Sequence, residues 1–225
     1  MERIKKIVLN NKYLSWILIF TNWFFQGIHL GSRIEKVYKI LFTLFFWGLF
    51  FLIFSFVLNF TLIYSLIIGL FVGHTINWFV NCNFYVIFIH RIKWFKIRPS
   101  RLFDQLYGIQ DRLKNKNWIL YSTSSGGICR GTMNGNSDID VSLVIKPGLK
   151  NAILAIIFFV KEKKIADFQR VPLDIFISET PEESLNRSNG QENPVVLYDP
   201  HNTIDSFYKE KMTIKEAQIL NNAIE

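Results

Sequence analysis

Residues 125–144 read SGGICRGTMNGNSDIDVSLV, and this stretch decides how the C-terminal half of the chain is interpreted. Two glycines, Gly126 and Gly127, precede ten mostly small or polar residues, and an Asp-Ile-Asp sequence at 138–140 then opens a run of β-formers. Side chains alternate between the two faces of a strand, so the two aspartates share one face. Because like charges on one face repel, folding alone gains nothing from such a pair. The stretch therefore predicts a turn followed by a strand that presents two carboxylates.

A third acidic residue lies in a later predicted strand, VPLDIFIS (171–178), where Asp174 is flanked by apolar residues. The intervening segment 151–168 is long and apolar enough for a helix that crosses back over a sheet, which would place the two strands side by side. Carboxylates without a nearby His or Cys cluster suit hard cations with oxygen ligands, Mg²⁺ or Mn²⁺. We therefore predict that Asp138, Asp140 and Asp174 converge and hold metal.

The residues before the aspartates suit a phosphate group. Backbone N–H groups at Gly126 and Gly127, directly after a strand, can approach a phosphate chain closely. Arg130 can add a charge-assisted hydrogen bond. Together the two halves of the stretch predict a triphosphate held by the glycines and bridged by metals on the aspartates.

The rest of the C-terminal half predicts a small α/β (α+β) domain with one mixed sheet covered by helices. Strands are expected at 118–123, 138–145, 171–178 and 194–199, and helices at 99–115, 151–168 and 206–222. Apolar residues fall on one face of the first helix: Leu102, Phe103, Leu106, Ile109 and Leu113. Thr213 and Glu216 have the spacing of a capping box, which can divide the last helix in two.

The order of these motifs resembles the nucleotidyltransferase superfamily of polymerase-β type. Its signature is a glycine pair, a loop, two aspartates separated by an apolar residue, and a later aspartate on a neighbouring strand. The matching residues here are Gly126-Gly127, Asp138-Ile139-Asp140 and Leu173-Asp174-Ile175. The Arg130-Gly131 and Ser137-Asp138 steps and the late VVLYDP strand are similar to the small, minimal members. The resemblance covers residues 100–205, and Ser125 stands where the superfamily has a bulky apolar residue.

The resemblance implies transfer of a nucleoside monophosphate from an NTP to an acceptor hydroxyl, with release of pyrophosphate by a two-metal mechanism. It implies metal ligation by Asp138, Asp140 and Asp174, with Asp174 also receiving the acceptor proton. It implies nucleotide contacts from Gly126, Gly127, Arg130 and Ser137. The alternatives are a catalytically inactive nucleotide sensor or membrane scaffold with the same fold, and acids that only cap a turn or face solvent. The presence of all three acids favours the enzyme.

The N-terminal half predicts a membrane hairpin. Residues 40–89 contain no Lys, Arg, Asp or Glu, and a transmembrane helix needs about 20 apolar residues. We therefore expect transmembrane helices at 40–59 and 60–81, joined by a tight turn at 59–61. A buried core hairpin would need a larger protein to cover it. A signal peptide would have a shorter apolar region nearer the N-terminus.

Basic residues at both ends of this hairpin set its orientation. Those before it are Arg33, Lys36 and Lys39, and those after it are Arg91, Lys93, Lys96, Arg98 and Arg101. Positive flanks face the cytoplasm, so an integral cell-membrane protein with a cytoplasmic catalytic domain is expected. Residues 13–30 either form a third span or, as their aromatic residues favour, an interfacial helix. The expected domains are a membrane-anchoring region, 1–98, with a basic juxtamembrane segment at 91–98, and a nucleotidyltransferase domain, 99–225.

The distribution of charge bears on the partners. The net charge is +8, yet residues 117–225 carry eleven basic and fourteen acidic groups, so the basic excess lies beside the predicted membrane segment. This disfavours nucleic acid as a partner and favours membrane lipids. The acceptor stays open among a lipid-linked or cell-envelope intermediate, a small hydroxyl compound, a protein side chain and an RNA end, and the hairpin favours the first. A homo-oligomer or a partner protein could complete the acceptor site.

Two other polar groups have a structural and a functional interpretation. A stripe on the second predicted membrane helix consists of His74, Asn77 and Asn81. It could contact a lipid headgroup or an acceptor, or form hydrogen bonds between helices. The lysine run at 161–164 is predicted to be a solvated helix end rather than a substrate clamp.

Overall fold

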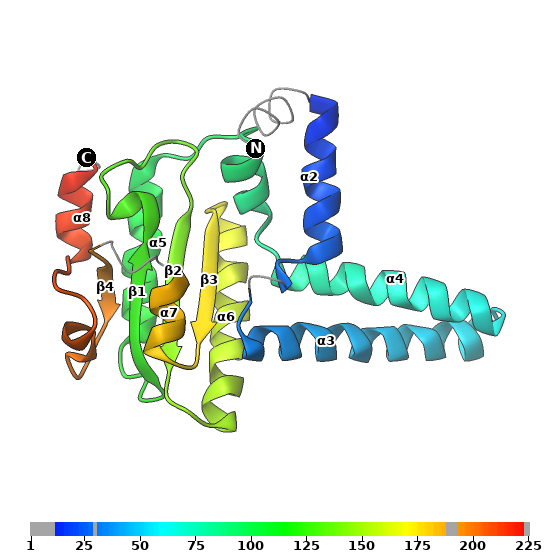
Figure 1. Ribbon diagram of the computed structural model, residues 1–225. Coiled ribbons are helices and arrows are strands. Elements are labelled where there is room, and N and C mark those ends of the chain that lie inside the picture. Colours follow the sequence, from blue (N-terminus) through cyan, green and yellow to red (C-terminus); the bar gives the residue numbers. More distant parts are fainter. Residues whose placement is uncertain (1–11, 29–30, 188–192, 223–225) are drawn as a thin grey trace. The chain divides into compact units, whose positions relative to one another are not determined.

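The computed structural model describes residues 12–28, 31–187 and 193–222 (Figure 1). Contacts between residues divide the chain into two compact units. Of the described residues, 19–82 form one unit, and 12–18 together with those from Asn83 onward form the other. Residues 83–98, which the sequence interpretation assigned to the membrane-anchoring region, thus belong to the unit that contains the sheet.

The sheet has four strands in the order β3-β2-β1-β4 (Figure 1). The strands are β1 (Ile119–Ser125), β2 (Ile139–Ile145), β3 (Leu173–Ser178) and β4 (Val195–Tyr198). β1 is antiparallel to both of its neighbours, β2 and β4, whereas β2 and β3 are parallel. The predicted small mixed sheet, with a crossover that places the two acidic strands side by side, is therefore confirmed.

Helices cover both faces of this sheet. α5 (Pro99–Leu113) and α6 (Leu149–Gln169) lie behind it in Figure 1, and α7 (Pro181–Arg187) lies in front. All five residues predicted for the apolar face of α5 are fully buried. On this side, Arg112 of α5 donates two hydrogen bonds to the carboxylate of Glu162 on α6, with donor-acceptor distances of 2.6 and 2.7 Å.

The C-terminal segment differs from the single helix expected at 206–222. A 3₁₀ turn spans Thr203–Ser206, and α8 spans Ile214–Leu220. α8 begins directly after Thr213 because the predicted capping box is formed. The Thr213 hydroxyl accepts a hydrogen bond from the backbone N–H of Glu216, and the Glu216 carboxylate accepts one from the backbone N–H of Thr213. The hydroxyl thus satisfies one N–H group at the start of α8 that has no partner within the helix.

The other unit contains two helices that are long and apolar enough to cross a membrane, by length and composition. α3 (Arg33–Leu52) continues as a π-helical turn (Ile53–Val57), and α4 (Leu62–Asn81) follows. α3 begins before the expected residue 40 because the Ser32 hydroxyl caps its first turn. The tight turn between the helices is confirmed by the left-handed backbone of Asn59, with φ of 53°.

The predicted interfacial helix is shorter than the expected 13–30. α2 spans Lys12–Phe25, and residues 29–30 lie outside the described residues.

The polar stripe of α4 forms hydrogen bonds within this unit. Asn77 donates to the backbone carbonyl of Lys39 at 2.9 Å and to the Thr43 hydroxyl at 2.6 Å, both in α3. Asn81 donates to the side chain of Asn77, and His74 Nε2 lies 2.9 Å from the backbone oxygen of Trp23. Of the two interpretations of the stripe, helix-to-helix hydrogen bonding is the one that these contacts support.

Two glycines let α3 and α4 approach closely. A Cβ atom at Gly69 would lie 3.0 Å from the backbone nitrogen of Phe51, and one at Gly73 would lie 2.7 Å from that of Trp47. Small residues at this four-residue spacing are typical of helix pairs in membranes.

We expect Gly73→Leu to lower the thermal stability of the helical hairpin in detergent, because a side chain there must push α3 and α4 apart. Overpacking of this kind costs about 1–3 kcal/mol. Gly48→Leu is the matched control, since a Cβ atom at Gly48 meets no described atom within 4 Å. Thermal unfolding of the two full-length variants measures the difference. Equal unfolding midpoints for the two variants would show that the close approach of the helices at Gly73 does not stabilise the hairpin.

Candidate functional site

Three carboxylates converge at one rim of the sheet. Asp138 directly precedes β2, Asp140 lies in β2, and the parallel register pairs Asp140 with Asp174 of β3. One carboxylate oxygen from each of the three can be chosen so that all lie within 4.8 Å of one another. The prediction that these acids converge is therefore confirmed.

The alternation of side chains along β2 explains which face carries the acids. Ile139 and Val141 are buried, whereas the aspartates on either side of Ile139 are partly exposed. Ser142, which follows Asp140 on the same face, lies 2.6 Å from the Ser184 hydroxyl of α7. The acids therefore lie on the α7 side of the sheet, opposite the core beneath α5 and α6.

The glycine pair begins a 3₁₀ turn, Gly126–Ile128, that directly follows β1. Gly126 has φ of 87°, and a Cβ atom there would lie 3.3 Å from Oδ2 of Asp140. Glycine is thus needed at this position both for its backbone and for the approach of the carboxylate. A Cβ atom at Gly127 would make an ordinary 3.5 Å contact with the Thr132 hydroxyl, so folding alone does not require glycine there.

A cavity of about 340 Å³ lies over this turn. Its lining includes every residue predicted to contact the nucleotide and two of the three acids: Gly126, Gly127, Arg130, Ser137, Asp138 and Asp140. The remaining lining residues are His90, Lys93, Thr132, Asn134 and Asn136. The structure thus brings the predicted residues together, with Asp174 next to the cavity but not in its lining. Three basic side chains beside two carboxylates suit a polyphosphate that carries cations.

His90 is a site residue that the sequence analysis did not identify. It lies in a π-helical turn, Val86–Arg91, and its Nδ1 is 3.2 Å from Oδ1 of Asp138 and 3.1 Å from the backbone oxygen of Asn136. No local motif marks it, because the contact joins segments that are far apart in the chain. In the sequence, only its position directly after the fifty residues without Lys, Arg, Asp or Glu sets it apart.

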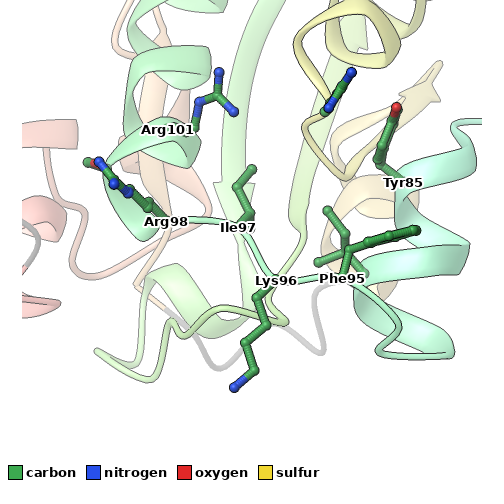
Figure 2. A pocket seen from close by; sticks show the side chains of 9 residues that line it. Tyr85, Phe95, Lys96, Ile97, Arg98 and Arg101 are labelled. Carbon is green, nitrogen blue, oxygen red and sulfur yellow. The ribbon is translucent and has the colours of Figure 1, made fainter.

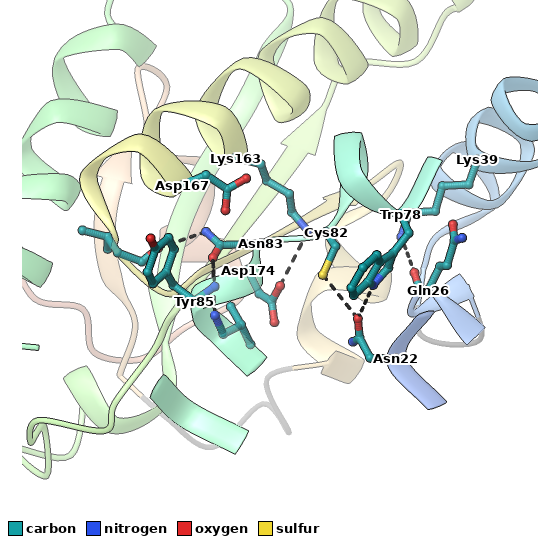
Figure 3. A network of polar contacts seen from close by, with 12 residues as sticks. Asn22, Gln26, Lys39, Trp78, Cys82, Asn83, Tyr85, Lys163, Asp167 and Asp174 are labelled. Atoms are coloured by element: carbon teal, nitrogen blue, oxygen red, sulfur yellow. Dashed lines mark hydrogen bonds and ion pairs between the residues drawn. The ribbon is translucent and has the colours of Figure 1, made fainter. Parts of the chain in front are cut away.

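Lys163 corrects the interpretation of the lysine run as a solvated helix end. Its side chain is only 8% exposed, and Nζ lies 3.6 Å from Oδ1 of Asp174 (Figure 3). The same Nζ lies 4.7 Å from the centroid of the Phe159 ring. Lys161 is exposed as expected. Lys163 therefore places a buried positive charge beside the third acid.

No protein-family model matches the chain, and no curated protein matches its sequence. The ligand atoms that the site itself offers indicate its chemistry. These are three carboxylate oxygens that lie within 4.8 Å of one another, and oxygen is the ligand atom that Mg²⁺ and Mn²⁺ prefer. Lys163 beside Asp174 offsets part of the negative charge, and Nδ1 of His90 lies beside Asp138. The donor set fits a hard divalent cation.

Proposed function

We propose that this chain is a membrane-anchored nucleotidyltransferase that moves a nucleoside monophosphate from an NTP to an acceptor hydroxyl and releases pyrophosphate. One observation carries the proposal. Asp138, Asp140 and Asp174 converge from two parallel strands beside a cavity that contains Gly126 and Arg130.

The three aspartates would hold Mg²⁺ or Mn²⁺. Two such ions would neutralise charge on the triphosphate and lower the pKa of the acceptor hydroxyl. Arg130 and Lys93 line the cavity and would contact the phosphate oxygens as charged donors. Gly127, where folding does not require a glycine, would let the backbone approach the phosphate chain.

At the α-phosphorus the reaction forms one bond and breaks one, and a proton moves from the acceptor hydroxyl. The acceptor oxygen bonds to the α-phosphorus, while the bond from that phosphorus to the oxygen bridging the β-phosphate breaks and its electron pair leaves with pyrophosphate. The hydroxyl proton passes to Asp174. This acid suits the acceptor side because it lies next to the nucleotide cavity but outside its lining.

The N-terminal helices support the membrane location. α3 with its π-helical continuation and α4 are long and apolar enough to span a bilayer, and basic residues flank the pair in sequence. Both flanks would then face the cytoplasm, where NTPs are available. We accordingly place the sheet-containing unit at the cytoplasmic surface.

Binding of Mg²⁺-nucleotide tests the role of the cavity. We expect Arg130→Gln to weaken the affinity for Mg²⁺-nucleotide by about tenfold, because the substitution removes one hydrogen bond to a charged group. The control is Lys209→Gln, which removes an exposed positive charge outside the cavity. Equilibrium binding of a labelled NTP to full-length protein in detergent, with Mg²⁺ and then with EDTA, measures both variants. If Arg130→Gln binds as tightly as wild type at equal thermal stability, the triphosphate lies elsewhere.

A further inference from the structure

A second cavity in the sheet-containing unit has a volume of about 680 Å³. Its basic lining residues are Lys96, Arg98, Arg101 and Arg170, and its aromatic ones are Tyr85 and Phe95. Figure 2 shows Tyr85 and Phe95 on one side, Arg98 and Arg101 on the other, and Ile97 between them. None of the described residues that line it is acidic. The cavity thus combines positive charge with apolar and aromatic surface.

Among the residues that the structure describes, no acidic side chain pairs with these four basic side chains. Several other basic residues of this unit do form such pairs, as Arg112 and Lys164 illustrate. Positive charges gathered around one cavity repel each other, and an anion in the cavity would relieve that repulsion.

This basic cavity shares a wall with the candidate site. Asn136, which lines the nucleotide cavity, donates hydrogen bonds of 3.1 Å to the backbone oxygens of Ile89 and Phe95, which line the basic cavity. The backbone N–H of Ile97 donates to Gly135 in the same loop at 2.9 Å. A molecule in the basic cavity would therefore lie next to the proposed site of transfer.

The lining suits an amphiphilic anion. Tyr85, which lines the cavity, follows the last residue of α4 by only four positions in the sequence, and two basic residues of the lining, Lys96 and Arg98, come from the juxtamembrane segment. Trp94 stacks on Phe88 with ring centroids 5.6 Å apart, and tryptophan, like the lining residue Tyr85, is a residue type enriched at membrane–water interfaces. Basic residues beside a membrane attract anionic lipid.

We propose that the basic cavity binds the phosphate group of a membrane lipid. Resting on the proposed function, we further infer that this lipid carries the hydroxyl that accepts the nucleoside monophosphate. The guanidinium groups of Arg101 and Arg170, from α5 and from the end of α6, would contact the phosphate oxygens. The aromatic side would contact the apolar part of the lipid.

Lipid binding to the full-length protein in neutral detergent micelles tests the proposal. The probes are phosphatidylglycerol, which is anionic and carries free hydroxyls, and phosphatidylcholine with the same acyl chains. We expect wild type to prefer phosphatidylglycerol, and the double variant Arg101→Gln with Arg170→Gln to bind it at least about tenfold more weakly. The double variant Lys209→Gln with Lys215→Gln loses the same charge outside the cavity and should bind like wild type.

The outcomes separate this proposal from the proposed function. Unchanged phosphatidylglycerol affinity in the arginine variant would overturn the lipid site. Inorganic phosphate that binds wild type as tightly as the lipid does would also overturn it, in favour of a free phosphate site. Nucleotide binding is measured in the same preparations and should be equal in all of them. If phosphatidylglycerol binds wild type and binds the arginine variant more weakly, yet no nucleotidyl transfer to any acceptor occurs, the lipid cavity is supported and the transferase function is contradicted.

Discussion

Replacing Asp174 with asparagine is expected to reduce nucleotidyl transfer by about 10³-fold or more while leaving most of the Mg²⁺-nucleotide affinity intact. Asparagine keeps the size of the side chain but removes the charge that would bind the acceptor-side metal and accept a proton. Because Asp174 lies outside the lining of the cavity over the Gly126–Ile128 turn, the proposed nucleotide contacts at Gly126, Gly127 and Arg130 should persist. The substitution should therefore weaken stabilisation of the transition state far more than binding of the nucleotide. Nucleotide affinity and label transfer, measured on the same preparation, test this.

Two further variants keep the result interpretable. Asp174→Asn removes one of the negative charges beside the buried Lys163, so some stability should be lost. Adding Lys163→Met should restore stability without restoring transfer. Asp167→Asn is the matched control, a partly buried acid paired with Lys164 outside the site, whose carboxyl pKa is raised by burial. A nucleotide sensor needs no activated hydroxyl, and full complementation of a deletion strain by Asp174→Asn would favour that alternative.

Arg112→Ala should lower the free energy of unfolding of the sheet-containing unit by about 3–5 kcal/mol. Glu162 has a side chain with no exposed surface, and Arg112 supplies both of its charged hydrogen bonds, so the substitution leaves a buried charge without a partner. The thermal midpoint, followed by fluorescence of the buried Trp118, measures the loss.

The neighbouring pair of Lys114 with Asp111 is the control. Both side chains are about two-thirds exposed, so Lys114→Ala should cost no more than about 1 kcal/mol. The double change Arg112→Leu with Glu162→Leu should recover most of the stability, because it removes both buried charges. Equal effects of Arg112→Ala and Lys114→Ala would show that the buried pair does not hold α5 to α6.

The sequence predicted those features that depend on local periodicity. Alternation along β2 placed the aspartates on the face opposite Ile139 and Val141, and the structure has them there. The apolar face of α5 and the capping box of α8 follow the same kind of short-range rule. The convergence of Asp140 with Asp174 could be predicted because a helix of crossover length separates two strands.

Features that depend on distant parts of the chain were not predictable in this way. Ile87 and Ile89 continue the apolar run of α4 in sequence, yet they are buried in the sheet-containing unit, because apolar composition does not distinguish membrane from core. α7 is short and mostly polar, so no apolar periodicity marks it. Position on α6 did not reveal that the long side chain of Lys163 reaches Asp174.

Transfer itself is the most direct test of the central claim. Full-length protein in detergent is incubated with α-labelled NTPs, Mg²⁺ and total cell extract, and label in each fraction is compared with the pyrophosphate released. The proposed function predicts that label enters an acceptor and that an equal amount of pyrophosphate is released. The further inference predicts that this acceptor is in the lipid fraction. With EDTA in place of Mg²⁺, we expect neither labelled acceptor nor pyrophosphate. Protein that binds Mg²⁺-nucleotide yet releases no pyrophosphate and labels no fraction would contradict the claim that Asp138, Asp140 and Asp174 form a nucleotidyltransferase centre.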